Sequence, residues 1–179
     1  MPKRTQNSKP EARDSPRLIL RPMVREDAVY IHEMRSDREL MKYIREPQTS
    51  IEDSLRWQQL VSSFWTINGL GLFAVIEKHS GLFAGWNGLW TVPETGEVEI
   101  GYAIARKFWR MGFATESGKE VLDYGFATLG LERIVAVARP ENAPSIRVMQ
   151  KLGMQGAGSG TYYGIDMIKY EIYASATDE

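Results

Sequence analysis

Residues 106–117, with the sequence RKFWRMGFATES, place cations, large aromatic side chains and a glycine directly ahead of an expected helix. The first N–H groups of a helix lack partners within the helix, and the helix dipole adds partial positive charge, so an anion is stabilised there. Arg106, Lys107 and Arg110 add full positive charges, and Gly112 allows close approach to the backbone. These features suit a diphosphate better than a carboxylate. Considered alone, the stretch fits equally well a solvated basic turn whose aromatic residues anchor it in the core.

A second helix start with polar residues lies in ENAPSIRVMQKLGM at 141–154, directly after the apolar run RIVAVARP at 133–140. That run is typical of a strand buried on both faces. We expect the two helix starts at the same edge of the sheet. Parallel strands that diverge there would leave a slot with unpaired main-chain groups for an extended, amide-bearing ligand, with Asn142 and Ser145 facing it. The alternative is that Asn142 only caps the helix and Ser145 only occupies its first turn.

The elements that position these residues follow from periodicity and turn signals. Thr49 and Glu52 have capping-box spacing ahead of an amphipathic helix. In chain order we expect a strand at 17–22, a short helix at 25–34, the amphipathic helix at 49–65, two antiparallel strands within 71–90, a strand at 97–105, a helix from about 112 to 129, a buried strand at 133–140, a helix at 141–153 and one or two strands within 160–175. This order predicts a mixed α/β sheet with one parallel crossover.

Composition bounds the class of protein. With 179 residues, 43% of them hydrophobic, the chain is long enough for one core, and we expect a single domain at 17–179. Residues 1–16 are rich in Pro and Ser as well as cations, which predicts a disordered basic tail. No cysteine is present, so a thiolate nucleophile and a cysteine zinc site are excluded. Residues 1–17 carry a net charge of +3 within a total of −1, so the rest of the chain carries −4, which argues against a nucleic-acid surface. Without a long apolar run we expect no membrane segment and a cytoplasmic location.

Three segments, EIGYAI, KFWRMGFATES and RPENAPSIRVMQKLGM, together resemble the GNAT superfamily of acetyl-coenzyme A-dependent N-acetyltransferases. The likeness runs from about Leu18 to Tyr173 and is strongest to the Rim-type branch, which modifies ribosomal-protein N-termini. It implies a GNAT-like α/β fold, in which a mixed, mainly antiparallel twisted sheet has one parallel splayed strand pair and flanking helices. It also implies acetyl-CoA as co-substrate and no metal.

The resemblance also implies which residues bind the cofactor. The family's pyrophosphate loop corresponds to Lys107 through Gly112, with Arg110 in place of its first glycine. The strand backbone is implied to pair with the pantetheine amides, and the start of the later helix to line the thioester end. The cofactor-binding candidates are Tyr102, Ala103, Ile104, Lys107, Trp109, Arg110, Met111, Gly112, Phe113, Ala114, Thr115, Asn142, Ser145 and Lys151.

A proton must reach the departing thiolate during acetyl transfer. Many relatives use a tyrosine at the position that Met149 occupies here, so this chain needs another donor. The resemblance suggests Ser145 for that role.

A proton must also leave the attacking amine, and Glu99 is the candidate base. It shares a strand face with Gly101 and Ala103, so the small neighbours leave it room to overlook the slot. The equally weighted alternative is an exposed carboxylate at a sheet edge. Asp166 and Glu97 are weaker candidates.

The resemblance implies direct acetyl transfer to a primary amine without a covalent enzyme intermediate. By resemblance the acceptor is a peptide or protein N-terminus; an amino acid, polyamine or amine drug is nearly as good a candidate, and a non-catalytic acyl-CoA-binding module remains open. The oligomer is expected to be a monomer or homodimer. His32 and His79 lack ligand-spaced partners, which argues against a metal site.

Overall fold

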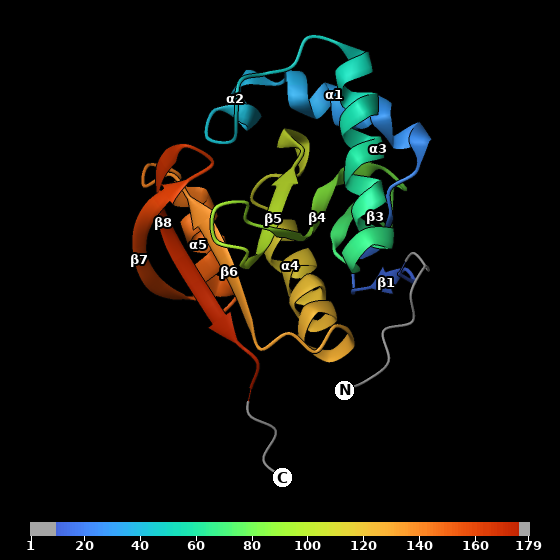
Figure 1. The fold of residues 1–179 in the computed structure, drawn as a ribbon. Helices are drawn as coiled ribbons and strands as arrows, with labels where there is room; N and C mark the ends of the chain where they lie inside the picture. Colours follow the sequence, from blue (N-terminus) through green and yellow to red (C-terminus); the bar gives the residue numbers. More distant parts are fainter. Residues whose placement is uncertain (1–9, 176–179) are drawn as a thin grey trace.

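The computed structural model describes residues 10–175, which form an eight-stranded sheet with helices on both faces (Figure 1). The strands are β1 (Arg13–Asp14), β2 (Leu18–Pro22), β3 (Gly71–Glu77), β4 (Phe83–Thr91), β5 (Val98–Ile104), β6 (Arg133–Ala138), β7 (Gln155–Tyr162) and β8 (Ile165–Tyr173). The α-helices are α1 (Ala28–Ser36), α2 (Arg38–Met41), α3 (Ile51–Asn68), α4 (Phe113–Asp123) and α5 (Ala143–Lys151). Shorter helical turns cover Arg25–Asp27, Arg106–Phe108 and Tyr124–Thr128. The predicted order of elements is confirmed.

The sheet has the order β1-β2-β3-β4-β5-β6-β8-β7, and its neighbouring strands are antiparallel except for β5 and β6. That parallel pair is in register only at Glu99 and Val135, near the start of β5. Farther along, β5 keeps its pairing with β4 but not with β6. The predicted splayed strand pair is therefore confirmed.

The two faces of β5 pack against different helices, as its strict alternation predicts. Ile100 and Ile104 belong to the hydrophobic core that includes Phe113 of α4. Ala103 belongs to a second core on the other face, which includes Ile31 of α1. Glu99 lies on the same face as Ala103 and therefore on the side of α1 and α3.

The start of α3 differs by one residue from the prediction. Ser50, rather than Thr49, is the N-cap: its hydroxyl accepts from the Glu52 N–H at 3.2 Å, and its extended backbone leads into the helix. On the buried face of α3, Trp65 is 3% exposed, whereas Leu60 is 54% exposed. The capping-box prediction at Thr49 is wrong, since both hydroxyl residues have the right chemistry and only the path of the chain selects between them.

The predicted disorder of residues 1–16 is wrong for Arg13–Ser15. Arg13–Asp14 pair antiparallel with β2. The Ser15 hydroxyl donates to Glu116 at 2.7 Å, and Arg13 forms ion pairs with Glu120 and Asp123 of α4. Acidic residues of α4 thus hold Arg13 and Ser15 in place, and the sequence of the tail alone does not reveal these contacts. Residues 1–9 of the predicted tail lie outside the described residues.

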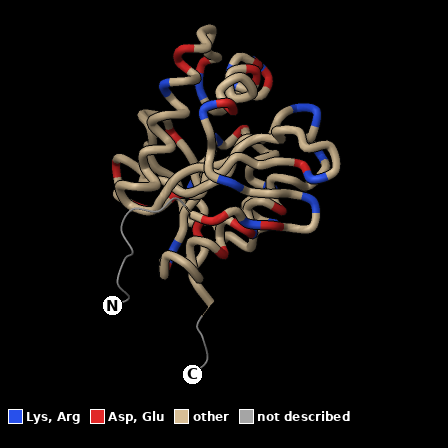
Figure 2. The backbone as a smooth tube through the Cα atoms, turned by 90° about the vertical axis from the view of Figure 1, so that its right-hand side faces the viewer, with Lys and Arg blue, Asp and Glu red and all other residues tan. Residues whose placement is uncertain are grey.

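Figure 2 shows positively and negatively charged residues at many places along the described chain. Among the described residues, none of the helices is long and apolar enough to cross a membrane.

Candidate active site

A cavity of about 1270 Å³ opens where β5 and β6 separate. It is lined by β4, β5 and β6, the start of α5, the β7–β8 hairpin, α3 and the segment that follows α1. Both predicted catalytic residues, Glu99 and Ser145, line it, as do Asn142 and Met149. The structure thus brings together residues that lie up to 50 positions apart in the chain.

Glu99 is buried at the base of this cavity, with 4% of its surface exposed. Trp90 Nε1 donates to its Oε2 at 2.8 Å, and the Tyr163 hydroxyl donates to the same oxygen. Burial raises the pKa of Glu99 to about 7, and these hydrogen bonds oppose the rise only in part. The alternative of an exposed edge carboxylate is therefore wrong, and Glu99 has the environment that a general base needs.

Tyr163 reaches Glu99 from the turn between β7 and β8. Tyr163 and Gly164 both have positive φ, 54° and 72°, as a two-residue hairpin turn requires. The Tyr163 N–H donates to Glu94 at 2.6 Å, which fixes the turn above β5. Burial, followed by the charge of Glu99, raises the pKa of Tyr163, so its hydroxyl remains a donor at neutral pH. The Tyr-Gly pair signals a turn in the sequence, but nothing local signals this contact.

Ser145 meets a second tyrosine across the splayed strands. The Ser145 Oγ lies 3.1 Å from the Tyr102 hydroxyl, which also donates to the Ser145 carbonyl at 3.1 Å. Burial raises the pKa of Tyr102 to about 12, which keeps the phenol protonated. Asn142 is the helix cap, as predicted: its Oδ1 accepts from the Ser145 N–H at 3.3 Å. Sequence reasoning assigned only the backbone of Tyr102 and missed its hydroxyl.

The start of α4 is formed by two residues in the left-handed backbone region. Arg110 has φ 64° and Gly112 has φ 82°. Gly112 is the N-cap, and no side chain caps the first N–H groups of α4. Arg110 therefore adopts the backbone conformation that a glycine favours, at the position where the family pattern has one.

Of the cations and aromatic residues ahead of α4, some pack into the core and others are exposed. Phe108 is buried, which fits the core-anchor interpretation, whereas Trp109 is 44% exposed and its indole N–H donates to the Ile104 carbonyl at 2.6 Å. Lys107 lies 5.1 Å above the ring of Phe108. Arg106 Nη1 lies 3.4 Å from Asp37 Oδ2, so Arg106 forms an ion pair with the residue that precedes α2.

The cavity lining does not include Ala103, Ile104 or the predicted residues from Lys107 to Thr115, and it also lacks Lys151, Asp166 and Glu97. Lys151 is exposed at the last residue of α5, whereas Asn142 and Ser145 lie at its start. Asp166 is exposed and accepts from Thr161, outside the cavity lining.

Glu97 is committed to ion pairs, which accounts for its absence from the cavity. Its carboxylate lies 2.7 Å from Arg133 and 3.3 Å from Lys169. Although burial opposes the effect, the Thr95 hydroxyl and Lys169 lower the pKa of Glu97. A carboxylate with a lowered pKa is a poor base at neutral pH.

The described residues contain no group of three or more His, Cys, Asp or Glu side chains arranged to hold a metal ion.

Comparison with known proteins agrees with this geometry. Residues 17–155 match the family model described as an acetyltransferase (GNAT) domain. An uncharacterized N-acetyltransferase, p20, from Bacillus licheniformis is 35% identical over 144 residues, which cover 79% of this chain and 81% of the relative. A spermidine N(1)-acetyltransferase from Escherichia coli K12 is 28% identical over 141 residues, which cover 78% of this chain and 73% of the relative.

A crystal structure of a GNAT-family acetyltransferase from Bacillus anthracis superimposes with a TM-score of 0.78 at 29% identity, covering 91% of this chain and 98% of that one. The sequence of this chain matches the GNAT family model over most of its length. Its structure has the sheet order, the splayed parallel strand pair and the uncapped helix start described above. The chain belongs to the GNAT acetyltransferases, a family of acyl-CoA-dependent N-acetyltransferases.

Proposed function

We propose that this chain transfers the acetyl group of acetyl-CoA directly to a primary amine in the cavity between β5 and β6, and that the acceptor is a peptide or protein N-terminus. The observation that carries the proposal is the meeting of Glu99, with its raised pKa, and the Tyr102–Ser145 hydroxyl pair in one cavity. One group accepts a proton and the other donates one, on two sides of a slot.

The residues at the splay suit acetyl-CoA, which supplies the activated acetyl thioester when bound. Tyr102, Ala103 and Ile104 pair with β4 on one side only, so their other backbone edge is available to pantetheine amides, except at the Ile104 carbonyl, which accepts from Trp109. The uncapped N–H groups that open α4 suit the diphosphate. We assign the phosphates to Lys107, Trp109, Arg110, Met111, Gly112, Phe113, Ala114 and Thr115.

Glu99 acts as the general base toward the acceptor amine. A pKa of about 7 leaves about half of the carboxyl groups ionised at neutral pH. The Trp90 and Tyr163 donors both bind Oε2 and so hold the carboxylate in one orientation. The proton removed from the amine resides on Glu99 until solvent takes it.

The Ser145 hydroxyl donates a proton to the departing sulfur, the Tyr102 hydroxyl, 3.1 Å away, orients it, and solvent returns a proton to the Ser145 oxygen. Met149 is 1% exposed and its thioether has no ionisable proton, so it cannot act as the proton donor. The pair thus supplies the donor that the family's tyrosine supplies elsewhere.

The overall proposal is tested by mixing the protein with acetyl-CoA and a panel of primary amines and measuring the release of CoA thiol. Peptides with free N-termini are expected to stimulate release more than amino acids, amine drugs or spermidine, the substrate that names one relative. Faster release with one of these small amines would assign a small-molecule acceptor. Tight CoA binding without release for any amine would identify a non-catalytic binding module.

Ser145→Ala is expected to lower kcat about tenfold while the KM for acetyl-CoA stays within about twofold. The reason is that the hydroxyl donates only as the thiolate leaves, whereas the Asn142 cap uses the Ser145 backbone. Steady-state kinetics with acetyl-CoA varied at saturating acceptor measure both values. Equal losses in kcat and acetyl-CoA affinity would show that the hydroxyl serves binding instead.

Arg110→Gly is expected to stabilise the fold by about 0.5–1 kcal/mol while raising the KM for acetyl-CoA about fivefold to tenfold. Glycine relieves the left-handed backbone at this position, but it also removes a charge from the proposed phosphate loop. Urea unfolding and steady-state kinetics measure the two effects. Arg110→Lys is the control, since it keeps the charge and the strain; an unchanged KM in Arg110→Gly would place the guanidinium in solvent.

A further inference from the structure

Arg35, the next-to-last residue of α1, is a buried cation with free donors. It is 2% exposed, and its Nε donates to Gln48 Oε1 at 2.8 Å. Its Nη2 has no hydrogen-bond partner, and no carboxylate among the described residues lies within ion-pair distance of it. Burial, followed by the charge of Arg45, lowers the pKa of Arg35 to about 10, so it remains charged at neutral pH. A buried charge without a counter-ion is costly, which points to an anion from outside the chain.

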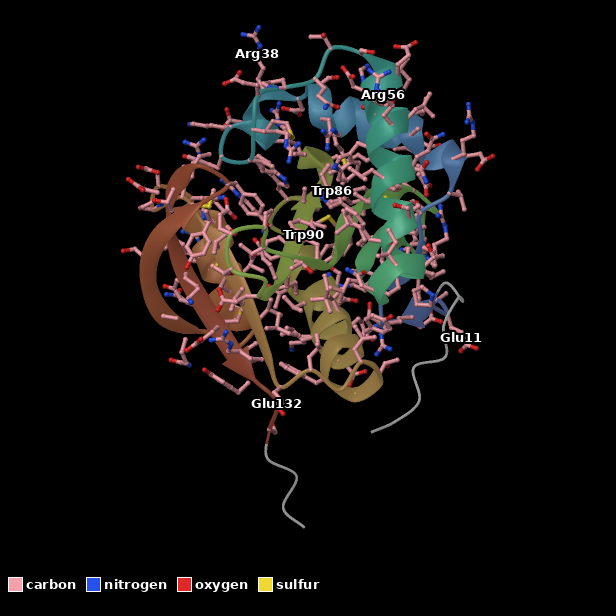
Figure 3. All side chains as sticks on the ribbon, in the orientation of Figure 1. Glu11, Arg38, Arg56, Trp86, Trp90 and Glu132 are labelled. Atoms are coloured by element: carbon pink, nitrogen blue, oxygen red, sulfur yellow. The ribbon has the colours of Figure 1, made fainter. Side chains whose placement is uncertain are left out.

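Arg35 lines the same cavity as Glu99, and an aromatic wall joins the two. The Arg35 guanidinium lies 4.4 Å from the centre of the Trp57 ring, and that ring lies 5.1 Å from the ring of Trp86. Trp90, which binds Glu99, is four residues farther along β4 and so on the same face. Figure 3 shows Trp86 and Trp90 near the centre of the molecule, with Arg38 at its periphery.

The length of this wall sets the reach of an acceptor. Four residues of β4 separate Trp86 from Trp90 by about 13 Å. Because Glu99 binds Trp90, whereas Arg35 reaches Trp86 only through Trp57, an amine at Glu99 and an anion at Arg35 are separated by on the order of 10 Å. A free amino acid is too short, because only one carbon joins its amine to its carboxylate. A peptide N-terminus with an acidic side chain on its third residue spans the distance.

The charges that line the cavity favour an anion and disfavour a polyamine. Glu46 and Glu99 are its acidic residues, and Glu99 is committed to the reacting amine. The cationic lining residues are Arg35, Arg38, Lys42, Arg45 and Arg139. The second cation of a polyamine would lie beside these residues, whereas a carboxylate would satisfy the free donors of Arg35.

We propose, resting on the acetyl-transfer function above, that the acceptor is an extended peptide N-terminus with an acidic residue near its third position, and that Arg35 binds that carboxylate across the tryptophan wall. Arg35 determines which acceptor enters, while Glu99 and Ser145 act on the reacting groups.

A purely structural role for Arg35 makes a different prediction. The segment after α2 is held to α1 by the Gln48 N–H, which donates to the Arg35 carbonyl at 2.8 Å, and by the Ser36 hydroxyl, which donates to the Gln48 carbonyl at 2.7 Å. These contacts do not need the guanidinium. Arg35→Met keeps the length of the side chain and loses the Nε hydrogen bond to Gln48, but it also removes a buried charge that lacks an ion-pair partner. We therefore expect the variant to fold with a Tm close to that of the unmodified chain.

The experiment uses C-terminally amidated tetrapeptides that differ only at the third residue, which is Glu, Gln or Lys. With the unmodified chain, kcat/KM measured by CoA thiol release is expected to fall from Glu to Gln to Lys, about tenfold between Glu and Gln. In Arg35→Met the ratio of Glu to Gln is expected to fall to within about twofold, with the KM for acetyl-CoA unchanged. Arg25→Met removes an exposed cation near the other end of α1, outside the cavity lining, and should keep the tenfold ratio.

The outcomes separate the two proposals. Turnover of the Gln or Lys peptide at or above the rate of the Glu peptide would overturn the role of Arg35 and leave acetyl transfer intact. A raised KM for acetyl-CoA in Arg35→Met would assign the anion to the cofactor and overturn it as well. No thiol release with any peptide or with the wider amine panel would remove the acetyl-transfer proposal itself. If Arg35→Met fails to fold, the peptide ratio of the unmodified chain can still overturn the proposal, because the absence of a preference for Glu would exclude an anion-binding site in the acceptor cavity.

Discussion

Glu99→Gln is expected to lower kcat for acetyl transfer about 10²–10³-fold at pH 7, because the amide cannot accept the proton of the attacking amine. The KM for acetyl-CoA should stay within about twofold, since Glu99 contacts Trp90 and Tyr163 rather than the proposed phosphate loop. The glutamine carbonyl still accepts from both donors, so the variant is expected to fold. Steady-state kinetics with each substrate varied in turn measure these values.

The pH profile gives an independent readout of the same group. With a pKa of about 7, Glu99 is the ionised base above neutrality, so kcat at saturating acceptor should rise as the pH increases through about 7. The rise should be absent from the residual activity of Glu99→Gln. Glu99→Asp is the matched control, since it retains the carboxyl group but draws it back from the cavity. An unchanged profile in Glu99→Gln would exclude Glu99 as the base.

The same carboxyl group affects stability in the opposite direction to activity. Its folded pKa of about 7 lies above its ordinary value of 4.5, so the folded chain holds this proton more tightly than the unfolded chain does. The contribution is fully present below about pH 4.5 and is lost as the pH rises through about 7. The free energy of unfolding of the unmodified chain should therefore decline over this range relative to that of Glu99→Gln.

Gly88→Ala is expected to destabilise the fold by at least about 3 kcal/mol. Gly88 lies in β4 between Leu72 of β3 and Gly101 of β5. A Cβ atom at this position would lie 2.1 Å from the carbonyl oxygen of Gly71 and 2.7 Å from the Cα of Leu72. Because these are backbone atoms of a paired strand, they cannot rotate away as a side chain does. Urea unfolding should show a lower midpoint.

Gly156→Ala is the control for that substitution. Gly156 lies in β7, and a Cβ atom there would meet no other atom within 4 Å. Its unfolding free energy should stay within about 0.5 kcal/mol of that of the unmodified chain. Equal effects of the two substitutions would show that loss of backbone freedom, rather than the clash with β3, determines the cost.

Periodicity in the sequence was sufficient to predict the elements that form the site. The alternation in residues 97–105 predicted the face of Glu99, and the apolar run at 133–140 predicted the buried strand β6. Asn142 was identified as a helix cap from its residue type and position. These predictions succeed because each depends on local geometry: which side chains a strand or helix places on the same face, and which side chains satisfy its first N–H groups.

The tertiary structure alone decided which side chains meet at the site. Tyr163 lies 64 residues from Glu99, and the two meet only because β8 pairs with β6 and its hairpin turn reaches β5. Nothing local in the sequence distinguishes Arg35 from the other cations of the chain. In the structure it packs against Trp57 and is buried with no carboxylate of the described residues within ion-pair distance. Local patterns determine which face of an element is buried, whereas strand order and the divergence of β5 from β6 determine which buried groups face each other.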